Sequence, residues 1–149
     1  MIRGCAHPPG IDVANGAYVN QHHLHIDMGV FNSQIRAFRQ WMKERGQQDK
    51  PLIVTEYGVL YDIFSEDQVH NFMLDTFDYF ATEKDCNLSS VDGCRLVQRW
   101  AWFSLEDIGW NFSPHGALFD KDSKRILPAG EKYRSYVLDN LEVLNNYHP

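Results

Sequence analysis

The sequence lacks the features that mark several large classes of protein. Its 149 residues contain no run of lysine or arginine and carry a formal net charge of −6, so we expect no nucleic acid and no membrane surface as a partner. No apolar stretch approaches the roughly 18 residues that a membrane helix needs. The first residues also lack the apolar core of a signal peptide, and the localisation stays unknown.

Cysteine is scarce, and its spacing excludes common metal and redox motifs. The chain has three cysteines, and no two of them have the Cys-x-x-Cys spacing of a zinc or redox site. Cys86 and Cys94 lie close enough on one polar loop to form a disulfide, which would leave Cys5 unpaired. Three free thiols are the alternative, and both possibilities stay open.

The sequence is rich instead in the residues of a packed core. Hydrophobic residues make up 44% and aromatic residues 13% of a chain that has the usual length of one domain. Prolines, glycines and asparagines interrupt residues 1–26, which show no sustained period, so we expect a long loop there. Residues 27–149 are then expected to form a single, incomplete domain.

Three segments have the apolar period of an amphipathic helix. The first covers residues 28–45 and is expected to stop at Gly46. The second follows Ser65, which forms a capping box with Gln68, and the third covers residues 129–144. The inner faces are predicted to hold Phe31, Ile35, Phe38 and Met42 in the first helix, Val69, Phe72, Met73, Thr76, Phe77 and Phe80 in the second, and Tyr133, Val137 and Leu141 in the third.

Two apolar runs between these helices are predicted strands. They are KPLIVTEYG, at residues 50–58, and RLVQRWAWFSL, at residues 95–105. Strands that alternate with helices predict a parallel sheet. Two parallel strands alone would leave two unpaired edges, which proteins cover because such edges promote aggregation. We therefore expect the chain to be the tail of a larger α/β domain.

Four motifs in order carry a resemblance to a known family. They are FRQWMKERG, KPLIVTEYG, QRWAWFSL and HGALFDKDSKRILPAGEKYRSY. Together they resemble the C-terminal part of a (β/α)8-barrel glycoside hydrolase, from the superfamily of retaining enzymes whose nucleophile is a glutamate at the end of strand seven. The resemblance implies an α/β fold, a partial TIM (β/α)8 barrel. It would cover the loop after strand six, helix six, strand seven, helix seven, strand eight and helix eight.

The resemblance implies that Glu56 is the catalytic nucleophile. Strict alternation along the strand would place Glu56 on one face with Leu52 and Val54, and Tyr57 on the other face, toward the helices. Barrel enzymes place their chemistry at the C-terminal ends of the strands, where Glu56 lies. The alternative is a structural acid that caps a helix or pairs with Arg99.

The second carboxyl group of a retaining glycosidase is missing from the sequence. In the superfamily it belongs to an Asn-Glu pair at the end of strand four, and this sequence contains no Asn-Glu dipeptide. Glu106 and Asp107 follow the second strand, and we expect them to form hydrogen bonds in a loop or with substrate. The chain is therefore expected to be inactive alone.

Aromatic residues supply the candidate substrate-binding positions. The resemblance implies that a tryptophan at the end of strand eight forms the floor of a sugar subsite. Trp102 is our choice, and we expect it on the same side of the sheet as Glu56. Trp100, Tyr57 and Trp110 are further candidates. Aromatic residues in this density are also typical of a core, so core packing is the alternative for Trp102 and Trp100. Tyr57 is expected to face the helices, with its hydroxyl within reach of the site. Trp110 lies in a polar loop, where it would either rim a cleft or face solvent.

The remaining motifs add no cofactor. HHLHID contains His22, His23, His25 and Asp27, but we favour a solvated loop over metal ligands because the stretch lacks a defined ligand spacing. We expect a fragment of a retaining glycoside hydrolase that acts on β-linked oligosaccharides or polysaccharides without a cofactor. Self-association or the missing barrel half is expected to cover its edges. The alternative is a non-catalytic carbohydrate-binding or interaction fragment.

Overall fold

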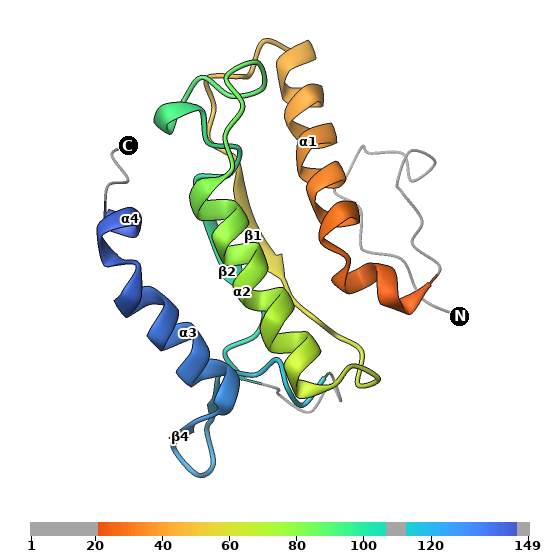
Figure 1. Ribbon diagram of the computed structural model, residues 1–149, viewed down its shortest axis with the longest axis vertical. Helices are drawn as coiled ribbons and strands as arrows, with labels where there is room; N and C mark the ends of the chain where they lie inside the picture. Colours follow the sequence, from red (N-terminus) through yellow and green to blue (C-terminus); the bar gives the residue numbers. More distant parts are fainter. Residues whose placement is uncertain (1–20, 107–112, 146–149) are drawn as a thin grey trace.

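Helices α1, α2 and α3 lie along a parallel pair of strands in the computed structural model, which describes residues 21–106 and 113–145 (Figure 1). No helix in these ranges is both long and apolar enough to cross a membrane. In chain order the elements are η2 (His22–Ile26), α1 (Met28–Glu44), β1 (Ile53–Tyr57), α2 (Glu66–Thr82), η3 (Asp92–Cys94), β2 (Arg99–Trp102), β3 (Phe119–Asp120), β4 (Arg125–Ile126), α3 (Pro128–Asp139) and α4 (Leu141–Asn145).

The ends of the first two helices follow the predicted signals. The Asp27 side chain caps α1 by accepting a hydrogen bond from the backbone N–H of Val30. Gly46, with φ of +65°, follows the end of this helix in the left-handed conformation that glycine adopts without strain. At α2 the predicted capping box is confirmed, because Ser65 and Gln68 each accept a hydrogen bond from the other's backbone N–H.

The parallel pairing of β1 with β2 is confirmed, but the predicted strict alternation along β1 is wrong. Val54 lies opposite Trp100, whereas Tyr57, not Glu56, lies opposite Trp102, so β1 uses one residue more than β2 over this interval. Such a β-bulge breaks the two-residue period of side-chain direction. Thr55 and Glu56 are consequently both exposed, and Tyr57 is half-buried.

The core lies between this sheet and the helices. All six residues predicted for the inner face of α2 are buried, and all but Phe72 are fully buried. Aromatic rings from β1 and β2 pack against this face. The core cluster comprises Val59, Phe64, Val69, Phe72, Met73, Phe77, Trp102 and Ala129.

Several local features differ from the prediction. Phe38 and Leu141 were predicted on the inner faces of their helices, but they are 48% and 43% exposed. The third helix is interrupted at Asn140 and continues as α4. A short hairpin of β3 and β4 precedes α3, in a stretch for which no strand was predicted. Its two-residue strands are too short to show a period in the sequence. Residues 22–26, expected within a long loop, form η2, whereas the rest of that loop up to residue 20 lies outside the described residues.

Cys86 and Cys94 form a disulfide, so the first of the two alternatives holds for this pair. The bond closes a small loop between α2 and β2. Lys84 and Arg95, which flank the disulfide, form an isolated antiparallel bridge that brings the ends of this loop together. Cys5 lies outside the described residues.

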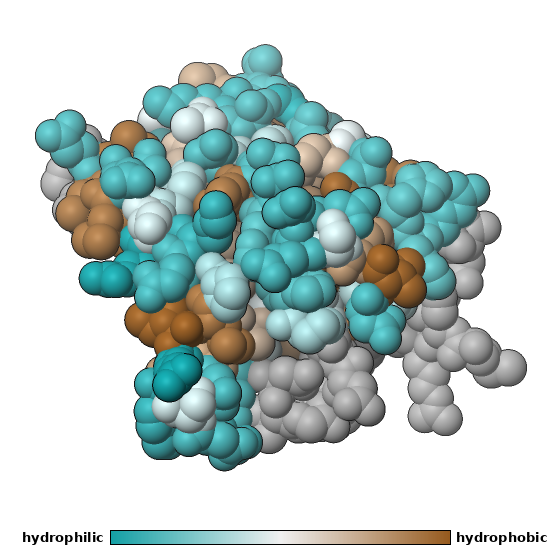
Figure 2. All heavy atoms as spheres, turned by 60° about the horizontal axis from the view of Figure 1, so that its bottom comes forward, coloured by the Kyte–Doolittle hydropathy of each residue, from teal (hydrophilic) through white to brown (hydrophobic). Residues whose placement is uncertain are grey.

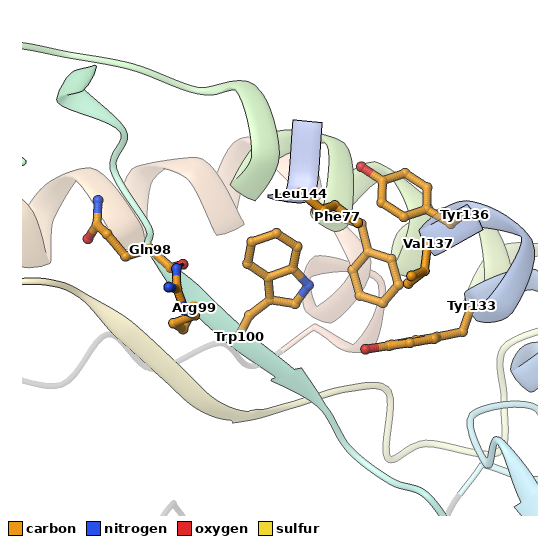
Figure 3. Close-up of a pocket in the computed structure, with 8 residues that line it drawn as sticks. All are labelled: Phe77, Gln98, Arg99, Trp100, Tyr133, Tyr136, Val137 and Leu144. Atoms are coloured by element: carbon orange, nitrogen blue, oxygen red, sulfur yellow. Dashed lines mark hydrogen bonds between the residues drawn. The ribbon is translucent and has the colours of Figure 1, made fainter. Parts of the chain in front are cut away.

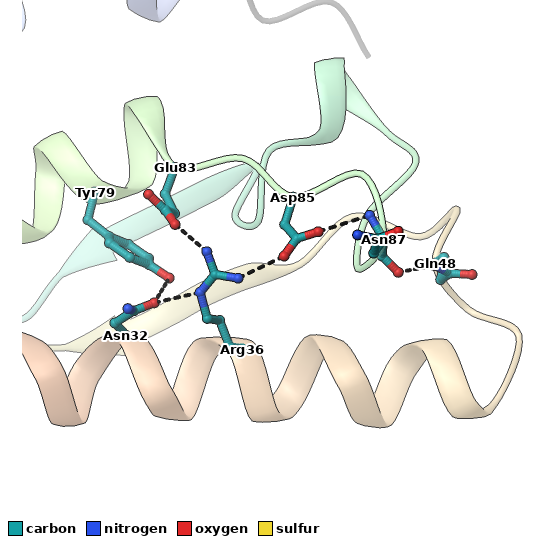
Figure 4. Close-up of polar contacts among 7 residues, drawn as sticks. All are labelled: Asn32, Arg36, Gln48, Tyr79, Glu83, Asp85 and Asn87. Carbon is teal, nitrogen blue, oxygen red and sulfur yellow. Dashed lines mark hydrogen bonds and ion pairs between the residues drawn. The ribbon is translucent and has the colours of Figure 1, made fainter.

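One arginine of α1 binds the segment that follows α2. Arg36 donates hydrogen bonds to the carboxylates of Glu83 and Asp85, the latter over 2.8 Å (Figure 4). Its Nε also donates to Asn32, whose side-chain oxygen accepts a second hydrogen bond from the Tyr79 hydroxyl. These contacts hold α1 beside the C-terminal part of α2.

Candidate active site

Glu56 is exposed at the C-terminal end of β1, one residue before the strand ends. Among the described residues, no hydrogen bond or ion pair uses its carboxylate, so here it neither caps a helix nor pairs with Arg99. Ile53 and Thr55 of β1 and Ala101 of β2 are exposed as well. A free carboxylate at a strand end has the chemistry that a nucleophile or a general base requires.

The ends of the two strands meet closely just beyond Glu56. The backbone N–H of Phe103 donates to the carbonyl oxygen of Tyr57 over 2.7 Å. A Cβ atom at Gly58 would lie 2.1 Å from the carbonyl oxygen of Phe103, a distance that no side chain tolerates. The glycine of the Thr-Glu-Tyr-Gly motif therefore allows the two backbones to approach and fixes the position of the strand end.

Tyr57 points toward the helices, as predicted. Its ring packs edge-on against Phe80 and Trp102, at centroid distances of 5.2 and 5.3 Å. Its hydroxyl forms a hydrogen bond of 3.2 Å with the Thr76 side chain of α2. Burial raises the pKa of Tyr57 far above its usual range, so this phenol stays protonated. Its substrate-binding role stays a prediction, and its contacts are those of a core residue.

Trp102 packs with Tyr57 on the helix-covered side of the sheet rather than beside Glu56. Its side chain is 7% exposed, and its indole Nε1–H donates to the carbonyl oxygen of Gly116 over 2.8 Å. We expected Trp102 to share a side with Glu56, and the β-bulge explains the difference because it sets Tyr57 opposite Trp102. The platform role of Trp102 stays a prediction, and the burial of its ring does not support it.

Trp100 lines a cavity of about 380 Å³ between β2 and the helices α2, α3 and α4 (Figure 3). Phe77, Tyr133 and Tyr136 surround the same space, and the other lining residues are Gln98, Arg99, Val137 and Leu144. Glu56 is not among them. The cavity is thus separate from the proposed nucleophile, and a role of Trp100 in binding substrate also stays a prediction.

The Glu106 carboxylate forms an ion pair with a lysine of the β3–β4 hairpin. One of its carboxylate oxygens lies 3.1 Å from Nζ of Lys121, and this contact raises the pKa of the lysine. Its backbone carbonyl accepts a hydrogen bond from the Ser104 hydroxyl. Asp107 and Trp110, the other candidates on this loop, lie outside the described residues.

The histidine-rich stretch forms η2 and the cap of α1. In residues 21–106 and 113–145, no group of three or more histidine, cysteine, aspartate or glutamate side chains is placed to hold a metal ion. Two of the histidines instead contact the ring of Tyr61. Sequence reasoning missed Tyr61, which carries no motif and is brought to η2 only by the fold.

A second acid was also missed. Glu66, the first residue of α2, lies between two imidazoles, with one carboxylate oxygen 3.9 Å from Nδ1 of His70 and the other 3.8 Å from Nδ1 of His115. The spacing of Glu66 and His70, four residues apart on a predicted helix, was a signal for this pair. His115 comes from the loop after β2, so the contact joins the start of α2 to that loop.

Comparison with known proteins assigns the chain to a family. The model of the glycosyl hydrolase catalytic core family matches residues 11–133, a range that contains Glu56 and extends from before η2 into α3. No curated protein and no solved structure gave a significant match. The match covers most of the chain, and the chain therefore belongs to the glycosyl hydrolase catalytic core family.

Proposed function

We propose that this chain carries the nucleophile of a retaining glycoside hydrolase for β-linked sugars, and that the nucleophile is Glu56. One observation supports the proposal. The Glu56 carboxylate is exposed at the C-terminal end of a parallel strand, has no partner among the residues that the structure describes, and lies in the range that matches the family. The C-terminal ends of parallel strands are where barrel enzymes place their catalytic groups.

The proposed reaction is a double displacement. A Glu56 oxygen attacks the anomeric carbon, the bond from that carbon to the leaving oxygen breaks, and the leaving oxygen takes the bonding electron pair. Water then attacks the same carbon and breaks its bond to Glu56, while a general base takes a proton from the water. This step restores the carboxylate and retains the configuration. No cofactor takes part in these steps.

The acid/base is proposed to come from outside this sequence. The sequence has no Asn-Glu dipeptide, and Glu106, the acid after β2, is paired with Lys121. Protonation of the leaving group by a positioned acid is typically worth about 10² to 10⁴ in rate. We therefore infer that the chain alone does not turn over ordinary glycosides.

The proposed context of this site is a (β/α)8 barrel in which β1 is strand seven and β2 is strand eight. The helices pack against the sheet side that holds Tyr57 and Trp102, whereas Ile53, Thr55 and Glu56 are exposed. Within the described residues β2 pairs only with β1, and the cavity at Trp100 adjoins this strand. A further strand beside β2 would cover both its edge and the cavity.

Mixing the chain with a separately expressed N-terminal portion of a related barrel tests the proposal. We expect hydrolysis of aryl β-glycosides that Glu56→Gln abolishes and that the exposed control Glu142→Gln leaves unchanged. Turnover that survives in Glu56→Gln would refute the assignment. Sugar binding without turnover would support a non-catalytic carbohydrate-binding fragment, which the absence of an Asn-Glu dipeptide from the sequence also favours.

A further inference from the structure

Two histidines of η2 enclose a tyrosine that follows strand β1. The ring centroids of His22 and Tyr61 lie 4.8 Å apart with an interplanar angle of 37°, and those of His25 and Tyr61 lie 4.8 Å apart at 61°. His22 is exposed, whereas His25 and Tyr61 are half-buried. We call these three residues the His–Tyr cluster.

The cluster keeps polar atoms available to a ligand. In the described part of the chain, neither the Tyr61 hydroxyl nor the His22 imidazole forms a hydrogen bond with another residue. A phenol and a neutral imidazole each contain a donor and an acceptor. A sugar hydroxyl could therefore both donate a hydrogen bond to the cluster and accept one from it.

Both segments of the cluster are anchored. Tyr61 and Ile26, the last residue of η2, pack against the core cluster, and Asp27 then caps α1. The rings are thus held by the fold before a ligand arrives, which reduces the entropy lost on binding.

Packing alone does not account for imidazoles at these positions. An apolar ring would cover Tyr61 equally well without ring nitrogens that must be kept hydrated or hydrogen-bonded. The neighbours Leu60 and Ile63 are 45% and 57% exposed. Apolar surface with a few fixed polar groups is the composition of a small-molecule site. Figure 2 brings this end of the molecule forward and shows apolar side chains among polar ones.

The cluster lies at the same end of the sheet as Glu56. Tyr61 follows Glu56 by only five residues, in the connection from β1 to α2. Figure 1 shows that this connection and η2 both lie beyond the C-terminal end of β1. A sugar chain bound at Glu56 and directed toward η2 would pass the cluster.

We propose that the His–Tyr cluster is a sugar-binding subsite at the end of the sheet that holds Glu56. The Tyr61 hydroxyl and the His22 imidazole exchange hydrogen bonds with hydroxyl groups of a β-linked oligosaccharide, while Leu60 contacts the apolar face of a sugar ring. This assignment rests on the proposed function, because it takes its ligand class from it.

The test measures binding of β-linked gluco-, manno- and xylo-oligosaccharides to the whole chain by ligand-observed and protein-observed NMR. All variants carry Glu56→Gln, so that no turnover interferes. Tyr61→Phe removes only the hydroxyl, and His22→Phe keeps a ring against Tyr61 but removes both nitrogens. The exposed neighbour His23→Phe is the matched control, and Tyr79→Phe controls for the loss of a phenol that bonds Asn32.

We expect Tyr61→Phe and His22→Phe each to weaken binding about three- to tenfold, the usual effect of one hydrogen bond, and both controls to bind like the parent. Equal binding by all four variants, or no binding at millimolar sugar, would overturn the subsite. Binding that depends on Tyr61 in a chain whose Glu56 proves non-catalytic would retain the subsite and refute only the nucleophile.

Discussion

Arg39 of α1 donates a buried hydrogen bond to the side-chain oxygen of Gln98, just before β2, and neither residue is more than 5% exposed. The same Gln98 oxygen accepts from the backbone N–H of Leu52 over 2.8 Å, just before β1. Arg39 also donates to the carbonyl oxygens of Leu96 and Lys50, over 2.6 and 3.0 Å. One arginine thus joins α1 to the N-terminal ends of both strands, and its burial lowers its pKa.

Arg39→Met should therefore destabilise the chain strongly. The substitution keeps an unbranched side chain but removes every one of these donors. The buried Leu96 carbonyl loses its partner, the Gln98 oxygen keeps only the Leu52 N–H, and a buried unsatisfied group costs about 1–3 kcal/mol. We expect the free energy of unfolding in urea to fall by at least about 2 kcal/mol. Arg134→Met, at a side chain that is 63% exposed, is the control. Equal urea midpoints for the two variants would contradict this role of Arg39.

Gly58→Ala should damage the strand end that positions Glu56. The added Cβ would meet the Phe103 carbonyl oxygen at 2.1 Å, so one of the two backbones must move. Overpacking of this kind costs about 1–3 kcal/mol. Gly116→Ala is the matched control, because its Cβ would make an ordinary contact of 3.5 Å with the Val59 carbonyl oxygen. Thermal unfolding that shifts equally in both variants would show that the Gly58 contact is not restrictive.

Loss of the disulfide should loosen the loop between α2 and β2. The bond joins residues eight positions apart, and closure of so small a loop is worth about 2–3 kcal/mol in the chain-entropy model. We expect Cys86→Ser with Cys94→Ser to lower the free energy of unfolding by that amount. A reducing agent that leaves the wild-type midpoint unchanged would argue against the bond in solution.

The Arg36 contacts should make stability depend on acid pH. The backbone N–H of Asn87 and the Arg36 guanidinium, over 2.9 and 2.8 Å, hold the pKa of Asp85 below its ordinary value of 3.8. A lowered folded-state pKa stabilises the protein fully above the unfolded-state pKa, and this contribution is lost as the pH falls through the folded-state pKa. Near neutral pH the wild type should thus have a higher melting temperature than Asp85→Asn. This difference in melting temperature should disappear as the pH falls below about 4.

A matched variant separates this effect from general acid denaturation. Asp75→Asn replaces an exposed aspartate of α2 that makes no ion pair among the described residues. Its gap from the wild type should stay small across the same pH range. A gap for Asp85→Asn that is constant down to pH 3 would show that the lowered pKa of Asp85 is not coupled to folding.

Sequence reasoning predicted the features that depend on neighbouring residues. The capping box of Ser65 and Gln68, the end of α1 before Gly46 and the buried face of α2 all follow from local hydrogen bonding and helical period. The location of Glu56 at a strand end followed from the apolar run that precedes it.

The directions of individual side chains could not be predicted from the sequence because they depend on tertiary contacts. The bulge between Val54 and Tyr57 arises from the pairing with β2, and a period count along β1 alone contains no sign of it. The same holds for the contact of Tyr61 with His22, which joins segments on either side of α1 and β1. Residues that contact one another only in the folded chain can be assigned to one site only when the fold is known.

Covalent trapping tests the role of Glu56 most directly. An aryl β-glycoside that is fluorinated at carbon two and carries a dinitrophenolate leaving group needs no acid, because the leaving group departs unprotonated. We would incubate it with the chain in the presence of the N-terminal portion of a related barrel, digest the protein and map the added sugar by mass spectrometry. We predict one sugar on Glu56, absent from Glu56→Gln. A sugar on another carboxylate such as Glu106, or no adduct at all, would contradict the assignment.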